Sequence, residues 1–184
     1  MLLHQKETSR LRFRNITNED YTPWLEFLRD EIATKFFNKP NSPEEMCRDW
    51  IERCLLRYEN DGHGLYALNE KNSNEFIGMC GLMLQEVEGK KFMEVGYHLF
   101  PKYWKKGFAT EAAVYCRDFG FENNMALDRK IISLIHTENF NSQAVAKRNG
   151  MKLERVAVWR EVPHCIFAIS TEEWSTNHHR DASR

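Results

Sequence analysis

Residues 103–112 read YWKKGFATEA and join a predicted strand to a predicted helix. The unpaired N–H groups and the positive dipole end at a helix N-terminus can bind phosphate. Gly107 lets the backbone approach an anion closely, and Ala109 adds little bulk. Lys105 and Lys106 supply local positive charge. An exposed basic loop before an ordinary helix explains the same residues, so this segment alone leaves both interpretations open.

The segments on either side predict a sheet flanked by helices. Alternating or buried apolar runs predict strands, and apolar residues three and four apart predict helices. The predicted strands are 10–16, 65–69, 75–85, 91–100, 130–136, 151–159 and 164–170. The predicted helices are 17–28, 42–59, 108–124 and 141–149. This order predicts an α/β (α+β) fold with a mixed sheet.

The second of these helices has the clearest start. Ser42 can cap it, Pro43 suits the first helical position, and Glu45 can complete a capping box. Its predicted apolar stripe consists of Met46, Trp50, Cys54 and Leu55.

The chain has 184 residues, the size of one ordinary domain. We expect a single domain over residues 1–175 and a polar tail over 176–184. Lysine and arginine number 26 against 27 aspartates and glutamates, so no global field attracts nucleic acid or an anionic membrane. No stretch reaches the roughly eighteen apolar residues of a membrane span.

The five cysteines lie far apart and form no C-x-x-C pair. This pattern predicts reduced thiols in a reducing compartment, and neither a disulfide framework nor a zinc site. The first residues lack the apolar run of a signal peptide. We therefore expect a cytoplasmic protein that binds no metal.

Four stretches in this order resemble the GNAT acetyltransferase superfamily, and within it the ribosomal-protein N-acetyltransferase (RimJ/RimL-like) branch. They are RLRFR at 10–14, EVGYHLFPKYWKKGFATEAA at 94–113, ENFNSQAVAKRNGM at 138–151 and AISTEEW at 168–174. The resemblance covers residues 10–174, and it favours the phosphate interpretation of the loop. It implies a mixed, mostly antiparallel central sheet of about seven strands flanked by about four helices.

The resemblance also implies acetyl-CoA as the acyl donor and assigns residues to it. The family's phosphate loop reads Q/R-x-x-G-x-G/A, and Gly107 and Ala109 fill its last two fixed positions, whereas Trp104 replaces the Gln or Arg. Asn139 would bond the pantetheine arm or orient the thioester, and Ser142 would lie near the sulfur. The residues implied to hold the pyrophosphate are Lys105, Lys106, Gly107, Phe108, Ala109 and Thr110. The residues implied to lie beside the pantetheine arm are His98, Leu99 and Phe100.

The chemistry requires a base, because an α-amine with a pKa of about 8 or a lysine with a pKa of about 10.4 arrives protonated. Glu94 is the leading candidate, and a cross-strand ion pair with lysine or arginine is its alternative role. Ser142 is the candidate proton donor or sulfur ligand, and a helix cap is its alternative role. Ala146 occupies the position where some superfamily members have a catalytic tyrosine, which excludes that acid.

These residues predict direct transfer of acetyl from acetyl-CoA to a primary amine in a ternary complex. A protein N-terminus, a polyamine, an amino sugar or an antibiotic would serve as acceptor, and the fold does not distinguish them. A non-catalytic acyl-CoA-binding or sensor module of the same fold is the alternative. The resemblance also suggests a homodimer.

Overall fold

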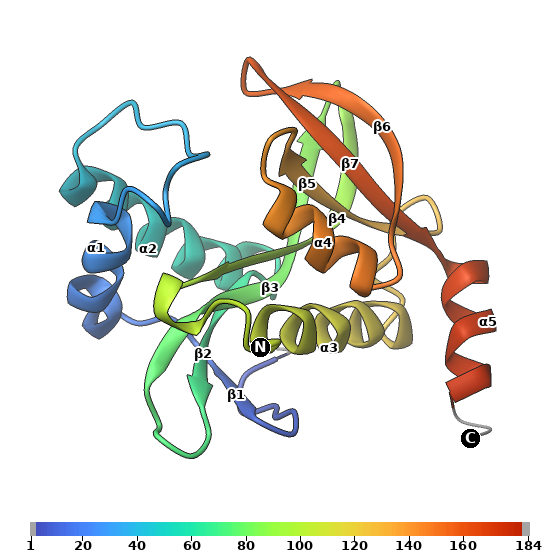
Figure 1. Cartoon of the computed structure of the whole chain (residues 1–184), viewed down its shortest axis with the longest axis horizontal. Coiled ribbons are helices and arrows are strands. Elements are labelled where there is room, and N and C mark those ends of the chain that lie inside the picture. Colours follow the sequence, from blue (N-terminus) through green and yellow to red (C-terminus); the bar gives the residue numbers. More distant parts are fainter. Residues whose placement is uncertain (1–2, 182–184) are drawn as a thin grey trace. The chain divides into compact units, whose positions relative to one another are not determined.

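The structure is a computed structural model that describes residues 3–181, with side chains described up to Thr176. Figure 1 shows the elements in chain order. The strands are β1 (Leu11–Arg14), β2 (Leu65–Glu70), β3 (Phe76–Val87), β4 (Lys90–Leu99), β5 (Lys130–His136), β6 (Lys152–Trp159) and β7 (Val162–Ser170). The α-helices are α1 (Tyr21–Arg29), α2 (Pro43–Asn60), α3 (Phe108–Glu122), α4 (Phe140–Arg148) and α5 (Thr171–Asp181). The 3₁₀ helices are η1 (Asn18–Asp20) and η2 (Pro101–Tyr103).

The strands form one open, seven-stranded sheet in the order β1-β2-β3-β4-β5-β7-β6. The β1–β2, β2–β3, β5–β7 and β6–β7 pairs are antiparallel, and the β4–β5 pair is parallel. The prediction of a mixed, mostly antiparallel sheet is therefore confirmed. Five α-helices accompany it where about four were predicted.

The chain divides into two compact units. Unit 1 comprises residues 1–81 and 97–112, and unit 2 comprises residues 82–96 and 113–184. β3, β4 and α3 each begin in one unit and end in the other.

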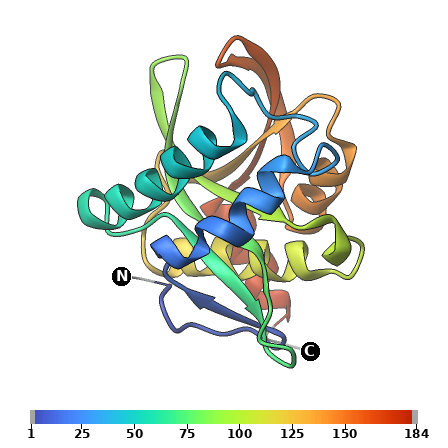
Figure 2. The same cartoon turned by 90° about the vertical axis from the view of Figure 1, so that its left-hand side faces the viewer.

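Unit 1 contains β1, β2 and the helices α1 and α2, which lie beside each other in both views (Figures 1 and 2). Leu11 and Phe13 on alternate positions of β1 are fully buried. The predicted capping box at the start of α2 is present: the Glu45 N–H donates to Ser42 Oγ at 3.3 Å, and the Ser42 N–H donates to Glu45 Oε2 at 3.1 Å.

Of the predicted apolar stripe of α2, Cys54 is buried, Met46, Trp50 and Leu55 are half-buried, and the Trp50 ring packs against Phe37 and His98. The buried side chains of this helix are Cys47, Ile51, Cys54 and Tyr58. These positions recur at spacings of three and four, so the helical period is right and the face is displaced by about one residue.

Unit 2 contains β5, β6, β7, α4 and α5. β6 and β7 form a long twisted hairpin, and α4 packs against β5 and β7 (Figure 1). One of its apolar clusters is formed by Val87, Phe92, Ile132, Ala157 and Ile166.

The end of the chain departs from the predicted polar tail, because α5 continues through Asp181. Trp174 anchors this helix within unit 2: its Nε1–H donates to Asp118 Oδ1 at 2.7 Å, and its ring stacks on Phe121 with centroids 5.0 Å apart. Residues 182–184 of the predicted tail lie outside the described residues. Within residues 3–181, no helix has the length and apolar content needed to cross a membrane.

Candidate active site

The predicted site residues fall into two groups, one in each compact unit. Residues 98–100 and 105–110 belong to unit 1, whereas Glu94, Asn139 and Ser142 belong to unit 2. Each group is described within its own unit.

The loop before α3 has the backbone of an anion-binding turn. Lys105 has φ +61° and Gly107 has φ +83°, both in the left-handed region. Alternation of left- and right-handed residues makes successive backbone N–H groups converge on a concavity that suits an anion. Lys105, Lys106 and Gly107 are exposed, so the loop is accessible from solvent.

The first turn of α3 extends this surface. The Glu111 N–H donates to the Gly107 carbonyl at 3.0 Å, which is the first hydrogen bond of the helix. The N–H groups of Phe108 and Ala109 precede that bond, where a helix leaves its donors without intrahelical acceptors. The dipole of a 15-residue helix adds positive potential at the same place. The chemistry of this end of α3 therefore fits a diphosphate.

Two aromatic residues fasten the loop to neighbouring parts of unit 1. Trp104 Nε1–H donates to the carbonyl of Leu99 at 2.6 Å. Tyr103 is buried and its hydroxyl donates to Glu75 Oε2 at 2.6 Å. Trp104, which departs from the general family pattern, thus joins the loop to the end of β4.

Sequence reasoning missed two residues that contact this loop, Arg10 and Glu111. Arg10 donates through Nη1 to the carbonyl of Lys106 at 2.9 Å and through Nε to Glu111 Oε2 at 2.6 Å. Both residues lie in stretches that carry the family resemblance. Nothing in either stretch alone reveals a contact across 101 positions of sequence.

The backbone at the end of β4 is partly bonded to β3. The Phe100 N–H donates to the Ile77 carbonyl on β3 at 3.1 Å, so this amide is already bonded within the sheet. The backbones of β3 and β4 also approach closely: a Cβ on Gly78 would lie 2.2 Å from the His98 carbonyl oxygen. Because backbone groups alternate in direction along a strand, Leu99 turns its own N–H away from β3.

The side chain of His98 belongs to an aromatic cluster in unit 1. Its ring centroid lies 5.0 Å from that of Trp50 and 5.4 Å from that of Phe37. Burial among these rings lowers the pKa of His98 to about 4. Trp24 is fully buried in the same cluster, which supports a core role for that tryptophan rather than a place in a binding-site wall.

In unit 2, Glu94 lies where the pairing of β4 with β5 stops. The described pairs are Met93 with Ile131 and Glu94 with Ile132. Beyond them, Glu94 Oε1 accepts the backbone N–H of Leu134 at 3.2 Å. Glu94 is only 6% exposed, so its carboxylate is held at the fork between the two strands.

A second side chain spans the same fork. Ser133 is buried, and its hydroxyl donates to the backbone carbonyl of Val95 at 2.7 Å. The side chains of Glu94 and Ser133 thus bond to the Leu134 N–H and the Val95 carbonyl, two backbone groups that continued pairing of β4 with β5 would otherwise satisfy. The hydrogen bond from Leu134 adds a structural role for Glu94 that differs from the ion pair considered as its alternative.

The N-terminal cap of α4 is Asn139. Its side-chain Oδ1 accepts the backbone N–H of Ser142 at 3.1 Å. The cap role considered for Ser142 therefore belongs to Asn139, and Ser142 lies in the first turn with a half-buried side chain. Ala146 is fully buried in the same helix.

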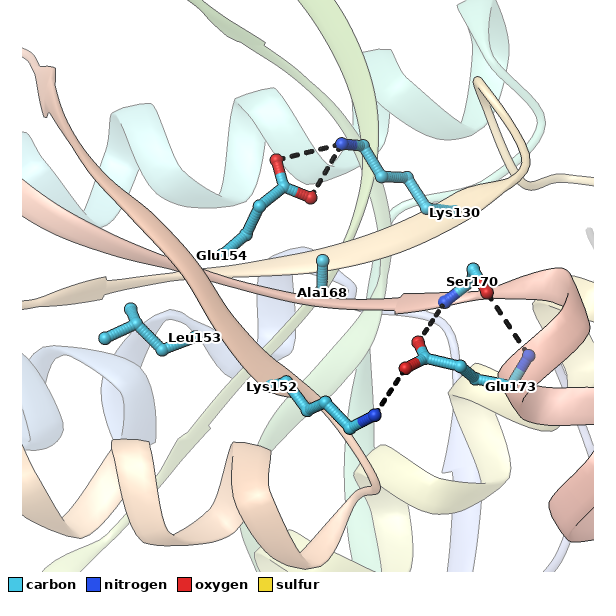
Figure 3. Close-up of a pocket in the computed structure, with 7 residues that line it drawn as sticks. All are labelled: Lys130, Lys152, Leu153, Glu154, Ala168, Ser170 and Glu173. Carbon is cyan, nitrogen blue, oxygen red and sulfur yellow. Dashed lines mark hydrogen bonds and ion pairs between the residues drawn. The ribbon is translucent and has the colours of Figure 1, made fainter.

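A surface pocket of about 210 Å³ in unit 2 contains none of the predicted site residues (Figure 3). Two ion pairs cross it, Lys130 with Glu154 at 2.8 Å and Lys152 with Glu173 at 2.6 Å. Its charged groups are therefore neutralised by one another. Among the described residues, no cluster of His, Cys, Asp and Glu has a geometry that could hold a metal ion.

Comparisons with known proteins identify the family. The family described as "Acetyltransferase (GNAT) domain" matches residues 10–152. The "Uncharacterized N-acetyltransferase p20" of Bacillus licheniformis is 29% identical over 177 residues, which cover 91% of this chain and 97% of that protein.

Solved structures show the same fold. An acetyltransferase from Agrobacterium tumefaciens superposes with a TM-score of 0.76 at 24% identity, covering 89% of this chain and 92% of its own. The ribosomal L7/L12 alpha-N-protein acetyltransferase RimL, solved in complex with coenzyme A, superposes with a TM-score of 0.69 at 15% identity, covering 92% and 98%. Because the family match covers most of its length, the chain belongs to the GNAT acetyltransferase family.

Proposed function

We propose that this protein is an N-acetyltransferase that transfers acetyl from acetyl-CoA to a primary amine. The observation that carries the proposal is the backbone of the loop before α3. Left-handed Lys105 and Gly107 lie directly before the helix N-terminus and beside two exposed lysine side chains. In a chain of this family, that arrangement supports binding of the pyrophosphate of acetyl-CoA.

The other cofactor contacts follow from the family resemblance and from the local geometry. Leu99 is the residue of the predicted 98–100 segment whose N–H is directed away from β3, so we assign the pantetheine contact to it. We assign the thioester end of the cofactor to Asn139 and Ser142. The N–H groups of residues 107–110 would bind the pyrophosphate, with Lys105 and Lys106 adding charge.

Glu94 is the proposed general base. The ammonium form of the acceptor must lose a proton before its nitrogen can attack the thioester carbonyl. The C–N bond then forms, the C–S bond breaks, and the thiolate takes the proton of the Ser142 hydroxyl, which is replaced by the second proton that the nitrogen loses as the amide forms. Burial of Glu94 at the fork supports this role, because a carboxylate held there has a fixed position.

A protein N-terminus is the acceptor class that we propose first, in keeping with the resemblance to the RimJ/RimL-like branch. Polyamines, amino sugars and antibiotics are the alternatives that an experiment must separate. The five cysteines are free and buried, which supports placement in the reducing cytoplasm. The homodimer stays a prediction, to be checked by light scattering.

The cofactor proposal is tested by calorimetric titration with coenzyme A. Replacing Gly107, which has φ +83°, by valine forces a branched side chain into a left-handed conformation at the loop. Gly89→Val is the matched control, because Gly89 has φ +75° and a Cβ added there would meet nothing within 4 Å. We expect only Gly107→Val to reduce affinity, by roughly tenfold or more. Equal affinities for both variants, or no affinity of the wild type, would overturn the proposal.

Turnover is tested by measuring thiol release from acetyl-CoA over a panel of amines. If Glu94 is the base, Glu94→Gln should lower kcat by about 10²–10⁴-fold. The glutamine keeps an oxygen that can accept the Leu134 N–H, so the fork is retained. Glu86→Gln, which changes an exposed carboxylate on β3, should leave kcat unchanged. An unaffected Glu94→Gln enzyme would restrict Glu94 to its structural role, and binding without turnover on any amine would favour the acyl-CoA sensor.

A further inference from the structure

The side chain of Arg10 links three parts of unit 1. Its Nη1 donates to the Lys106 carbonyl at 2.9 Å and its Nε donates to Glu111 Oε2 at 2.6 Å. Its guanidinium also lies over the ring of Phe108, 4.5 Å from the centroid. Arg10 therefore contacts the loop immediately before Gly107, the residue immediately after it, and the first turn of α3.

Glu111 holds this arginine in place. One carboxylate oxygen, Oε1, accepts hydrogen bonds from the Thr8 hydroxyl at 2.5 Å, the Ser9 hydroxyl at 3.0 Å and the Arg10 N–H at 2.9 Å. The other oxygen, Oε2, accepts the guanidinium. An acidic residue in the first turn of a phosphate-binding helix would otherwise repel the ligand. Here its charge is neutralised by Arg10 and engaged by the segment that precedes β1.

The contact with Lys106 fixes the direction of the next amide. In a trans peptide the carbonyl and the following N–H point in opposite directions. Holding the Lys106 carbonyl against Arg10 therefore turns the Gly107 N–H to the other side of the peptide plane. The Gly107 carbonyl is fixed in turn by the Glu111 N–H at 3.0 Å. The peptide group before Gly107 is thus oriented by the Arg10 side chain, and the one after it by the first hydrogen bond of α3.

We propose that Arg10 is a positioning residue that preorganises the Gly107 amide for the pyrophosphate of the acyl donor. This inference rests on the proposed function of the loop. The guanidinium acts through the backbone, and its own charge is already paired with Glu111. A donor with a pyrophosphate should therefore depend on Arg10, whereas a donor without one should not.

The test compares two acyl donors with the variant Arg10→Lys. Lysine keeps the positive charge but cannot bond to Glu111 and to the Lys106 carbonyl through a rigid planar fork. We expect kcat/KM for acetyl-CoA to fall roughly ten- to a hundredfold, mainly through KM, because a displaced binding group is poorly aligned. For acetyl-pantetheine, which has the same thioester but no phosphate, we expect kcat/KM to remain within about twofold of wild type.

Arg12→Lys is the matched control, because Arg12 lies two residues away, is similarly exposed and pairs through Nε with Glu7 at 2.8 Å. It should leave both donors unaffected. Hydrogen exchange of the apo protein gives a second readout that needs no turnover: Arg10→Lys should accelerate exchange of the Glu111 amide, which is bonded to the Gly107 carbonyl, and leave β5 unchanged.

The possible results separate this inference from the proposed function. Parallel losses with both donors would mean that Arg10 serves general stability, and no loss with either would mean that it positions nothing. Either result, with wild-type coenzyme A binding intact, overturns the inference alone. Failure of the wild type to bind coenzyme A would instead overturn the proposed function.

Discussion

At the scale of single residues, His98 makes the stability of the protein depend on pH. Burial among aromatic rings lowers its pKa from 6.5 to about 4. Between these values the unfolded chain binds a proton that the folded chain excludes. Because the folded pKa is depressed, the stability associated with His98 is complete above about pH 6.5 and is lost as the pH falls towards 4.

Replacing His98 by phenylalanine removes the titrating imidazole and places another aromatic ring among the surrounding rings. We expect the fall in unfolding free energy between pH 6.5 and 5 to be smaller in His98→Phe than in wild type by roughly 1–2 kcal/mol. Urea denaturation at the two pH values measures this difference. Identical pH dependence in His98→Phe and wild type would contradict the assignment.

The residue scale also shows which parts of the site were predictable. Gly107 was recognisable because only glycine adopts its left-handed conformation without strain. Lys105 is also left-handed, with φ +61°, but nothing about a lysine in the sequence predicts a left-handed backbone. The contact of Arg10 with Glu111 was unpredictable for another reason: it joins residues that only the folded sheet and helix bring together.

At the scale of elements, the start of α2 provides a direct stability test. Ser42 accepts the Glu45 N–H and donates its own N–H to the Glu45 carboxylate, so both halves of the capping box are present. Ser42→Ala removes the acceptor and should lower the unfolding free energy by about 1 kcal/mol. Ser42→Asp retains an acceptor and should restore most of the loss. Equal stability of the alanine variant and wild type, measured by urea denaturation, would show that the cap contributes nothing.

The elements differ in how far local sequence determined them. β5 has the predicted bounds, 130–136, because a continuous apolar run marks a buried strand. The most buried positions of α2 lie about one residue from the predicted stripe, because the helix carries apolar residues on more than one side, Leu56 being 45% exposed. The continuation of α5 was missed because residues 176–181 are polar, and the helix is fastened by Trp174 through a contact with α3 that local periodicity does not reveal.

At the scale of the whole molecule, the two compact units are joined by three shared elements. β3, β4 and α3 each cross from one unit to the other. Unfolding one unit would therefore break strands and a helix that the other unit requires. We expect a single calorimetric transition with equal calorimetric and van't Hoff enthalpies, consistent with one domain over residues 1–175.

A core substitution in unit 2 tests this coupling more sharply than the wild-type transition does. Ile166 is fully buried in β7, and Ile166→Ala should lower the unfolding free energy by roughly 2–5 kcal/mol. If the units unfold together, the slowest-exchanging amides of β2 in unit 1 should lose the same free energy of protection as those of β7. If β2 keeps its wild-type protection while β7 loses its own, the units are independent.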